Sequence, residues 1–370
     1  MNEQTQHLLA LSLTKGLGPV SVKNLIAYCG SVSSVFSAPK GKLMRAPGIG
    51  EHAVSLVKAS QELERAEREL AYCQKHGIKV LSYLDAAYPH ALKYIHDAPL
   101  ILFKKGKVEL NAQPNIAIVG TRKATDYGKE QAELFARFFA ERGINVVSGL
   151  AYGIDIAAHR ATLNVGGKTT AVLGHGLDTI YPSRHTSRAR DMEEKGGLLT
   201  EYLTGIGPEA PHFPARNRIV SGLCKAVLVI EAGERGGALI TARTAFEQDR
   251  LVYALPGRVE DPYSTGCNNL IRDNIARLVS SPAEVLDDLD IQWQQHEDQT
   301  EQLELALSPP SIPLSAEEAK ILNFLGKGEA VFDNISVHTG IPPQQLNSLL
   351  LTMEFKELLR QLPGKKFRRR

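Results

Sequence analysis

Glycine, hydroxyl and arginine residues follow one another at the end of an apolar run about a third of the way along the sequence. The stretch "IAIVGTRKA" at 116–124 turns at Gly120 and continues with Thr121 and Arg122. A glycine turn lets backbone N–H groups approach a phosphate closely, and an arginine can donate a pair of hydrogen bonds to it. The dinucleotide fingerprint has a second glycine where Arg122 stands. The pattern therefore predicts a phosphate site and argues against a bound dinucleotide.

Further turns of the same kind end other apolar runs. Each can place a helix N-terminus, with its unpaired backbone N–H groups, beside an anion. The candidate residues in these turns are Ser148, Gly149 and Gly153 in "SGLAYGID", Gly174 in "LGHGLD", and Gly236 and Gly237 in "AGERGGAL". Parallel sheets also need small residues at strand-to-helix turns, so a purely structural role stays open. We favour anion binding because arginine or hydroxyl residues accompany several turns.

An aromatic residue beside two arginines adds a preference for a ligand class. "HFPARNRIV" at 212–220 contains Phe213, Arg216, Asn217 and Arg218 at an expected helix start. An aromatic ring can stack on a base while guanidinium groups hold the backbone of a single strand. These residues therefore favour single-stranded nucleic acid, although a core phenylalanine with surface arginines stays open.

Common enzyme signatures are incomplete. "GGKTT" at 166–170 resembles the end of a P-loop, but it leads into an expected strand and position 162 is threonine instead of glycine. Asp155 and His159 lie one helical turn apart and could exchange protons, although such pairs more often fix a loop. We therefore expect neither ATP hydrolysis nor a cofactor or metal.

The middle of the chain predicts the scaffold for these residues. From about residue 76, short apolar runs alternate with helical stretches of 10–16 residues. This alternation is typical of an α/β fold, in which a mostly parallel, Rossmann-like sheet carries helices on both faces. Ligands of such folds gather at the carboxyl ends of the strands, where the glycine turns are expected.

The flanks predict smaller domains. Residues 1–72 are expected to form an all-helical domain of helix-hairpin-helix (SAM-like) type, in which "PGIG" at 47–50 either binds a phosphate or only packs. We find no internal repeat. The predicted order is therefore 1–72 helical, 76–290 Rossmann-like core, 291–314 acidic and proline-containing linker, and 315–370 winged helix.

Composition sets the outer limits. The chain has 370 residues, of which 43% are hydrophobic and 23% charged, and its net charge of +2 is too small to predict a nucleic-acid partner by itself. Its four cysteines are far apart in the sequence, which argues against a zinc or thiol-redox site. No secretory signal or membrane-spanning run is evident, so we expect a cytoplasmic protein with no membrane partner.

Six stretches together resemble the DNA-processing protein A (DprA/Smf) family. They are "IAIVGTRKAT", "SGLAYGIDIAAH", "GKTTAVLGHGLDTIYP", "FPARNRIVSGL", "AGERGGALITAR" and "LPGRVEDPYSTGCNNLIRD". The resemblance implies a core that binds single-stranded DNA without cutting it, forms homodimers and helps load the RecA recombinase during natural transformation. It also implies that Arg122, Gly149, Gly153 and the "FPARNR" stretch belong to the DNA pocket. One departure is Tyr152, where the family often has lysine or arginine.

Two alternatives remain. A nucleotide-processing phosphoribohydrolase of the same broad fold would need a glutamate three residues after Thr241, where this sequence has Thr244. A sequence-specific regulator could instead bind duplex DNA through the winged helix and its basic tail "GKKFRRR".

Overall fold

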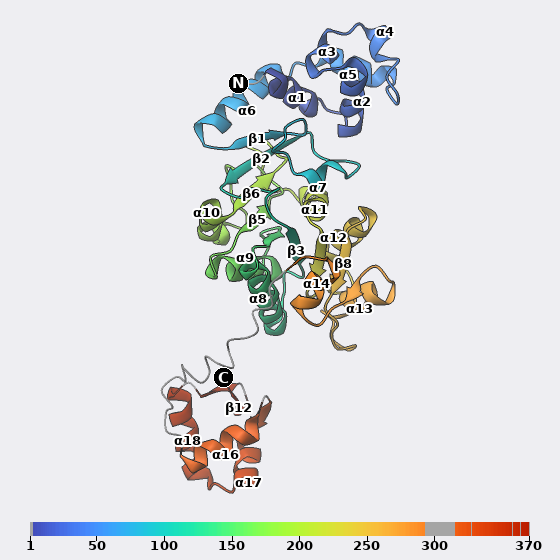
Figure 1. The fold of residues 1–370 in the computed structure, drawn as a ribbon. Helices are drawn as coiled ribbons and strands as arrows, with labels where there is room; N and C mark the ends of the chain where they lie inside the picture. The colour runs from blue at the N-terminus through green and yellow to red at the C-terminus, as the bar shows by residue number, and fades with distance from the viewer. Residues whose placement is uncertain (1–2, 293–314, 327, 357, 363, 370) are drawn as a thin grey trace. The chain divides into compact units, whose positions relative to one another are not determined.

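The computed structural model describes residues 3–292, 315–326, 328–356, 358–362 and 364–369 (Figure 1). The chain divides into two compact units, residues 1–293 and 294–370. The linker predicted for 291–314 lies outside the described residues except for its first two positions.

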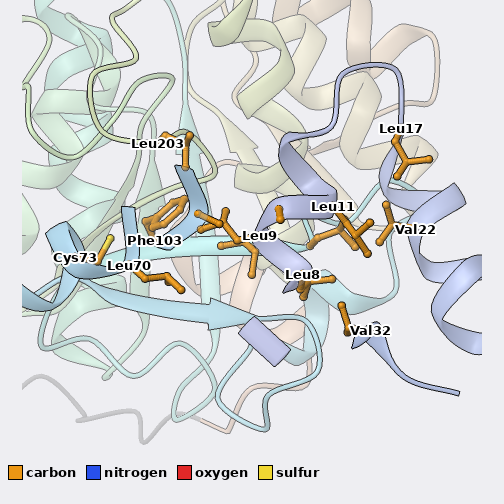
Figure 2. Packing of buried hydrophobic residues seen from close by; sticks show 14 of the residues in the cluster. Leu8, Leu9, Leu11, Leu17, Val22, Val32, Leu70, Cys73, Phe103 and Leu203 are labelled. Carbon is orange, nitrogen blue, oxygen red and sulfur yellow. The ribbon is translucent and has the colours of Figure 1, made fainter. Parts of the chain in front are cut away.

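The first unit begins with an all-helical bundle. Its helices are α1 (Glu3–Leu13), α2 (Pro19–Cys29), α3 (Val32–Ser37), α4 (Lys40–Leu43), α5 (Glu51–Ala59) and α6 (Leu63–Lys75). Leucines of α1 belong to the same buried cluster as Phe103 and Leu203 of the α/β core (Figure 2). The carboxylate of Glu69 on α6 also accepts hydrogen bonds from the N–H and hydroxyl of Thr204, at 2.9 and 2.7 Å. The bundle is therefore joined to the core by apolar packing and by a buried carboxylate.

Two turns of this bundle have the same backbone geometry. Gly16 and Gly48 have φ of 83° and 73°, and each is followed by a buried aliphatic residue, Leu17 or Ile49. The N–H of Leu17 donates to the carbonyl oxygen of Thr14 at 3.1 Å, and the N–H of Ile49 donates to that of Ala46 at 3.2 Å. The bundle therefore contains two interhelical glycine turns with similar backbone geometry.

The core of the first unit is a nine-stranded sheet among the described residues. Its order is β1-β2-β6-β5-β4-β3-β7-β8-β9, and the strands from β6 to β9 run parallel, whereas β1 and β2 pair antiparallel at one edge. The strands are β1 (Lys79–Ser82), β2 (Ile101–Gly106), β3 (Asn115–Val119), β4 (Asn145–Ser148), β5 (Thr169–Val172), β6 (Gly197–Thr200), β7 (Ala226–Val229), β8 (Leu251–Ala254) and β9 (Arg277–Leu278). The mostly parallel α/β sheet is therefore confirmed.

Alternate residues of the strands pack on opposite faces of this sheet. Ile116 and Ile118 of β3 pack with one set of helices, and Ala117 and Val119 pack with the other. The first set is α8 (Asp126–Glu141), α9 (Ile154–Asn164) and α14 (Pro282–Asp288). The second set is α7 (His90–Lys93), α11 (His212–Leu223), α12 (Gly237–Glu247) and α13 (Thr265–Arg272). Near the antiparallel edge, η1 (Ser183–His185) leads into α10 (Thr186–Lys195), which contacts β2, β5 and β6.

The second unit is a winged helix, as predicted. It contains α16 (Ala316–Leu325), β10 (Glu329–Val331), α17 (Phe332–Thr339), α18 (Pro343–Phe355), β11 (Leu359–Leu362) and β12 (Lys366–Arg369). Its sheet has the order β10-β12-β11. Ser315 and Glu318 form a capping box at the start of α16, and Lys356 contacts the Glu318 carboxylate at 2.8 Å. This small unit also has its own hydrophobic core, which includes Ile321, Ile335, Leu346, Met353 and Phe367.

Candidate functional site

The first unit contains a pocket of about 590 Å³ at the carboxyl ends of β3, β4 and β7. The chain leaves β3 toward β4 on one side, and β7 lies on the other side, so strand order reverses at this point. In open parallel sheets, ligands bind at such a switch point. The position follows from topology alone and does not depend on the pocket's chemistry.

Most of the residues that the sequence singled out meet in this pocket. Those lining it are Gly120, Thr121, Arg122, Gly149, Phe213, Arg216, Asn217, Gly236 and Gly237. They come from the turns after β3, β4 and β7 and from the first half of α11. The structure therefore brings four separate sequence stretches to one place, although a role in binding remains a prediction for each residue.

Gly174 and three further candidates do not line the pocket, and the contacts of those three show where they lie instead. Ser148 is buried, and its hydroxyl donates to the carbonyl of Ile118 at 2.6 Å. Gly153 has a φ of 79°, and a Cβ on it would lie 2.2 Å from the carbonyl oxygen of Thr121. Arg218 is held in an ion-pair network with Asp97 at 2.9 Å and Glu201 at 2.6 Å. These contacts give all three a structural place beside the pocket.

Aromatic rings and a guanidinium form one side of the pocket. The Arg122 guanidinium lies over the Phe213 ring, 5.6 Å from its centroid. The ring of Tyr181 lies 5.8 Å from that of Phe213, at an interplanar angle of 37°. Tyr181 is 46% exposed, so its face is available to a ligand. A cation beside two rings matches what a base and its phosphate require.

The floor of the pocket is a buried polar arrangement. Arg216 is 5% exposed and donates to the carbonyl oxygens of Gly149, at 2.9 Å, and Val172. Asp155 accepts from the N–H groups of Gly149 and Ala151 at 3.1 and 3.2 Å. Burial lowers the pKa of Arg216 to about 10, which leaves it cationic at neutral pH. Arg216 therefore supplies positive charge from below and holds the turn after β4.

Burial and the nearby cation act oppositely on Asp155. Burial raises the pKa of its carboxyl group, and the charge of Arg216 counteracts that shift. His159 lies deeper, where its Nδ1 is 2.6 Å from the hydroxyl of Thr169, and burial lowers its pKa to about 3. Since Asp155 binds loop amides and His159 does not line the pocket, these contacts support the loop-fixing interpretation of the pair.

The turn that carries Arg122 is tied on both sides. Thr121 donates its N–H to the carbonyl of Glu231 at 2.7 Å, and its own carbonyl accepts from the N–H of Ile154 at 3.3 Å. A Cβ at Gly120 would lie 2.4 Å from the Ile154 side chain, so only glycine fits there. The backbone from Gly120 to Arg122 is therefore fixed before any ligand arrives.

Sequence reasoning did not single out two further residues that line the pocket. Arg235 lines it from "AGERGG", beside the glycines that were chosen, so its charge next to the glycine pair was an available signal. Tyr181 lies in the loop before η1, far in sequence from the other lining residues. Its place in "GKTTAVLGHGLDTIYP", one of the six stretches of the family resemblance, was the available signal.

Comparison with known proteins decides the family. The family model described as DNA recombination-mediator protein A matches residues 79–290, and the model of the DprA winged helix domain matches residues 306–365. The chain belongs to the DNA processing protein A family. The two DprA models fall on the α/β core of the first unit and on the winged helix of the second.

Individual DprA relatives agree with this assignment. Protein Smf of Escherichia coli (strain K12) is 36% identical over 324 residues, which are 84% of this chain and 86% of that protein. The DNA processing protein DprA of Streptococcus pneumoniae is 45% identical over 205 residues, or 55% of this chain and 72% of that protein.

Solved DprA structures share the fold. The X-ray structure of DprA from Streptococcus pneumoniae matches with a TM-score of 0.66 and 35% identity over 78% of this chain and 99% of that one. A structure of DNA processing protein A from Helicobacter pylori, which concerns that protein's single-stranded DNA binding mode, matches with a TM-score of 0.53 and 28% identity. That match covers 59% of this chain and 97% of the other. Among the residues described here, no helix combines the length and apolarity of a membrane span.

Proposed function

We propose that this protein binds single-stranded DNA in the pocket at the switch point and does not cut it. The observation that carries the proposal is the guanidinium of Arg122 over the ring of Phe213, beside Tyr181. Glycines in the turns after β3 and β7 allow a strand to come close to the protein backbone in the pocket, and Arg216 adds positive charge at the pocket floor. Single-stranded DNA binding by the Helicobacter pylori relative supports the same ligand class.

The residues proposed to contact or shape the strand are those of the sequence prediction. We propose that Arg122, Phe213 and Asn217 contact the strand, and that Gly120, Thr121, Gly149, Gly236 and Gly237, which also line the pocket, shape the turns around it. Arg216 supports the floor, and Ser148, Gly153 and Arg218 hold the surrounding turns.

A gel-shift comparison tests the ligand class. We expect the wild type to shift a single-stranded oligonucleotide at lower protein concentration than a duplex, and Arg122→Ala to weaken the single-strand shift. Arg137→Ala is the matched control, because Arg137 is an exposed arginine on α8 that does not line the pocket. Equal weakening in both variants would show that general charge, and not this pocket, binds the strand.

The absence of cleavage is part of the proposal. A phosphoribohydrolase would need a proton-transferring carboxylate where Thr244 stands. Asp155, the carboxylate that lines the pocket, is hydrogen-bonded to loop amides. Incubation with nucleoside monophosphates should therefore release no base, and release of a base would refute this part of the proposal.

The remaining parts rest on DprA membership. We propose a cytoplasmic homodimer that forms through the α/β core, protects incoming single strands and passes them to the RecA recombinase. Light scattering tests the dimer, and a RecA filament assay on strands coated with single-strand-binding protein tests the transfer. A monomer at all concentrations, or no gain in RecA loading, would contradict these parts separately.

A further inference from the structure

A buried carboxylate lies at the N-terminus of α8. Glu231 follows β7, is 3% exposed and directs its side chain toward Thr125, which is the N-cap residue of that helix. One oxygen accepts the N–H of Thr125 at 3.0 Å, and the other accepts the Thr125 hydroxyl. The same hydroxyl accepts the N–H of Gly128 at 3.0 Å. The carboxylate, which follows β7, therefore takes part in capping the N-terminus of α8.

This helix terminus has a special place in the fold. α8 follows β3, the strand at the switch point, and in dinucleotide-binding sheets the corresponding helix N-terminus receives the pyrophosphate. The partial positive charge of a helix N-terminus favours an anion there. In this protein, an anion of the chain itself takes that position, since the carboxylate of Glu231 bonds the N-cap.

The Glu231 carboxylate also packs tightly against the first turn of α8. A Cβ added to Gly128, in the first turn of α8, would lie 2.2 Å from the carboxyl carbon of Glu231 and 2.1 Å from one of its oxygens. The glycine therefore packs directly against the carboxylate. A phosphate group is larger than a carboxylate, so it has no room beside Glu231 and would also meet its negative charge.

We infer that Glu231 determines ligand specificity by occupying the phosphate position at the α8 N-terminus. The α8 N-terminus then holds neither free phosphate nor the terminal phosphate of a nucleotide, and a phosphodiester link of a strand lies elsewhere in the pocket, toward Arg122. The statement about the strand rests on the proposed function, whereas the exclusion of free phosphate stands separately. The backbone of the same residue fixes Thr121, so one residue both closes this position and sets the turn that carries Arg122.

Inorganic phosphate and a thymidine mononucleotide are the direct probes. We expect neither to raise the midpoint of thermal unfolding of the wild type, and we expect both to raise that of Glu231→Ala. The variant should bind phosphate at least roughly ten times as tightly as the wild type does. Glu234→Ala is the matched control, because Glu234 is an exposed glutamate of the same loop, whereas Glu231 is buried against the N-cap of α8. It removes the same charge without opening the helix terminus, so it should gain no phosphate binding.

Wild-type protein provides a second test that does not depend on how the variant folds. Adding a 5′-phosphate to a short oligothymidylate should leave its affinity unchanged, and inorganic phosphate at constant ionic strength should not compete with it. A several-fold gain from the 5′-phosphate, specific competition by phosphate, or a folded Glu231→Ala that gains no phosphate binding would overturn the inference. Failure of the wild type to bind the oligonucleotide at all would instead refute the proposed function.

Discussion

At the scale of single residues, the proposed strand binding depends on the contact between Phe213 and Arg122. Stacking of a base on an aromatic ring contributes roughly 1–3 kcal/mol, so Phe213→Ala should weaken single-strand binding by about that amount. Phe246→Ala is the control, since this ring of α12 is 53% exposed and does not line the pocket. Fluorescence anisotropy with a labelled oligonucleotide measures both. Equal losses would place the stacking elsewhere.

His159 makes stability depend on pH. Its pKa is lowered by burial from 6.5 to about 3 in the folded protein, so the unfolded chain binds a proton that the folded chain does not. Stability that is present above pH 6.5 is therefore lost as the pH falls, by about 1.4 kcal/mol per pH unit. Urea unfolding of the wild type and His159→Gln at several pH values measures this. The variant should show a smaller slope, and an identical slope would contradict the assignment.

The region from Arg216 to Arg218 shows what sequence can and cannot predict about side chains. The aromatic and basic composition correctly indicated a segment that lies beside the pocket. Consecutive residues of a helix point about 100° apart, so the three side chains had to separate. Arg216 lies at the buried floor, Asn217 lines the pocket, and Arg218 forms an ion pair with Glu201. The direction of each depends on how α11 packs, which composition does not reveal.

At the scale of elements, the two equivalent turns of the N-terminal bundle depend on left-handed glycines. Gly16 and Gly48 have φ of 83° and 73°, where a Cβ is unfavourable. Substituting alanine at either should lower the free energy of unfolding by roughly 1–2 kcal/mol. Gly41→Ala is the control, because Gly41 lies within α4 with open space around its Cβ position, and alanine favours a helix. Equal effects at all three sites, measured by urea unfolding, would contradict this account.

The elements themselves were largely predictable. Alternation of apolar runs and helical stretches fixed a mostly parallel sheet, and each chosen glycine turn lies where an element begins or ends. The sequence shows a glycine turn at both places, 14–21 and 45–57, although the residues before the shared glycines differ, with Thr14 and Lys15 in one turn and Ala46 and Pro47 in the other. Their equivalence is a matter of backbone angles and hydrogen bonds, which sequence identity reports poorly.

At the scale of the whole molecule, we propose that the α/β core alone carries single-strand binding. The switch-point pocket lies entirely in the first unit, and the winged helix has its own hydrophobic core. Removing residues 308–370 should therefore leave single-strand affinity within about threefold of the wild type. Gel shifts on the truncated and full chains measure this. A loss of more than tenfold would assign binding to the winged helix and favour the duplex-reading alternative.

The salt dependence of single-strand affinity tests the central claim most directly. Neutralising phosphates releases counterions, so the logarithm of the affinity should fall linearly with the logarithm of salt concentration, by about 0.7 per phosphate contacted. The slope for Arg122→Ala should be shallower than that of the wild type by about 0.7, because this variant loses one phosphate contact. Arg137→Ala should keep the wild-type slope. A wild-type affinity indifferent to salt, or an unchanged slope and affinity in Arg122→Ala, would contradict a strand phosphate held by Arg122.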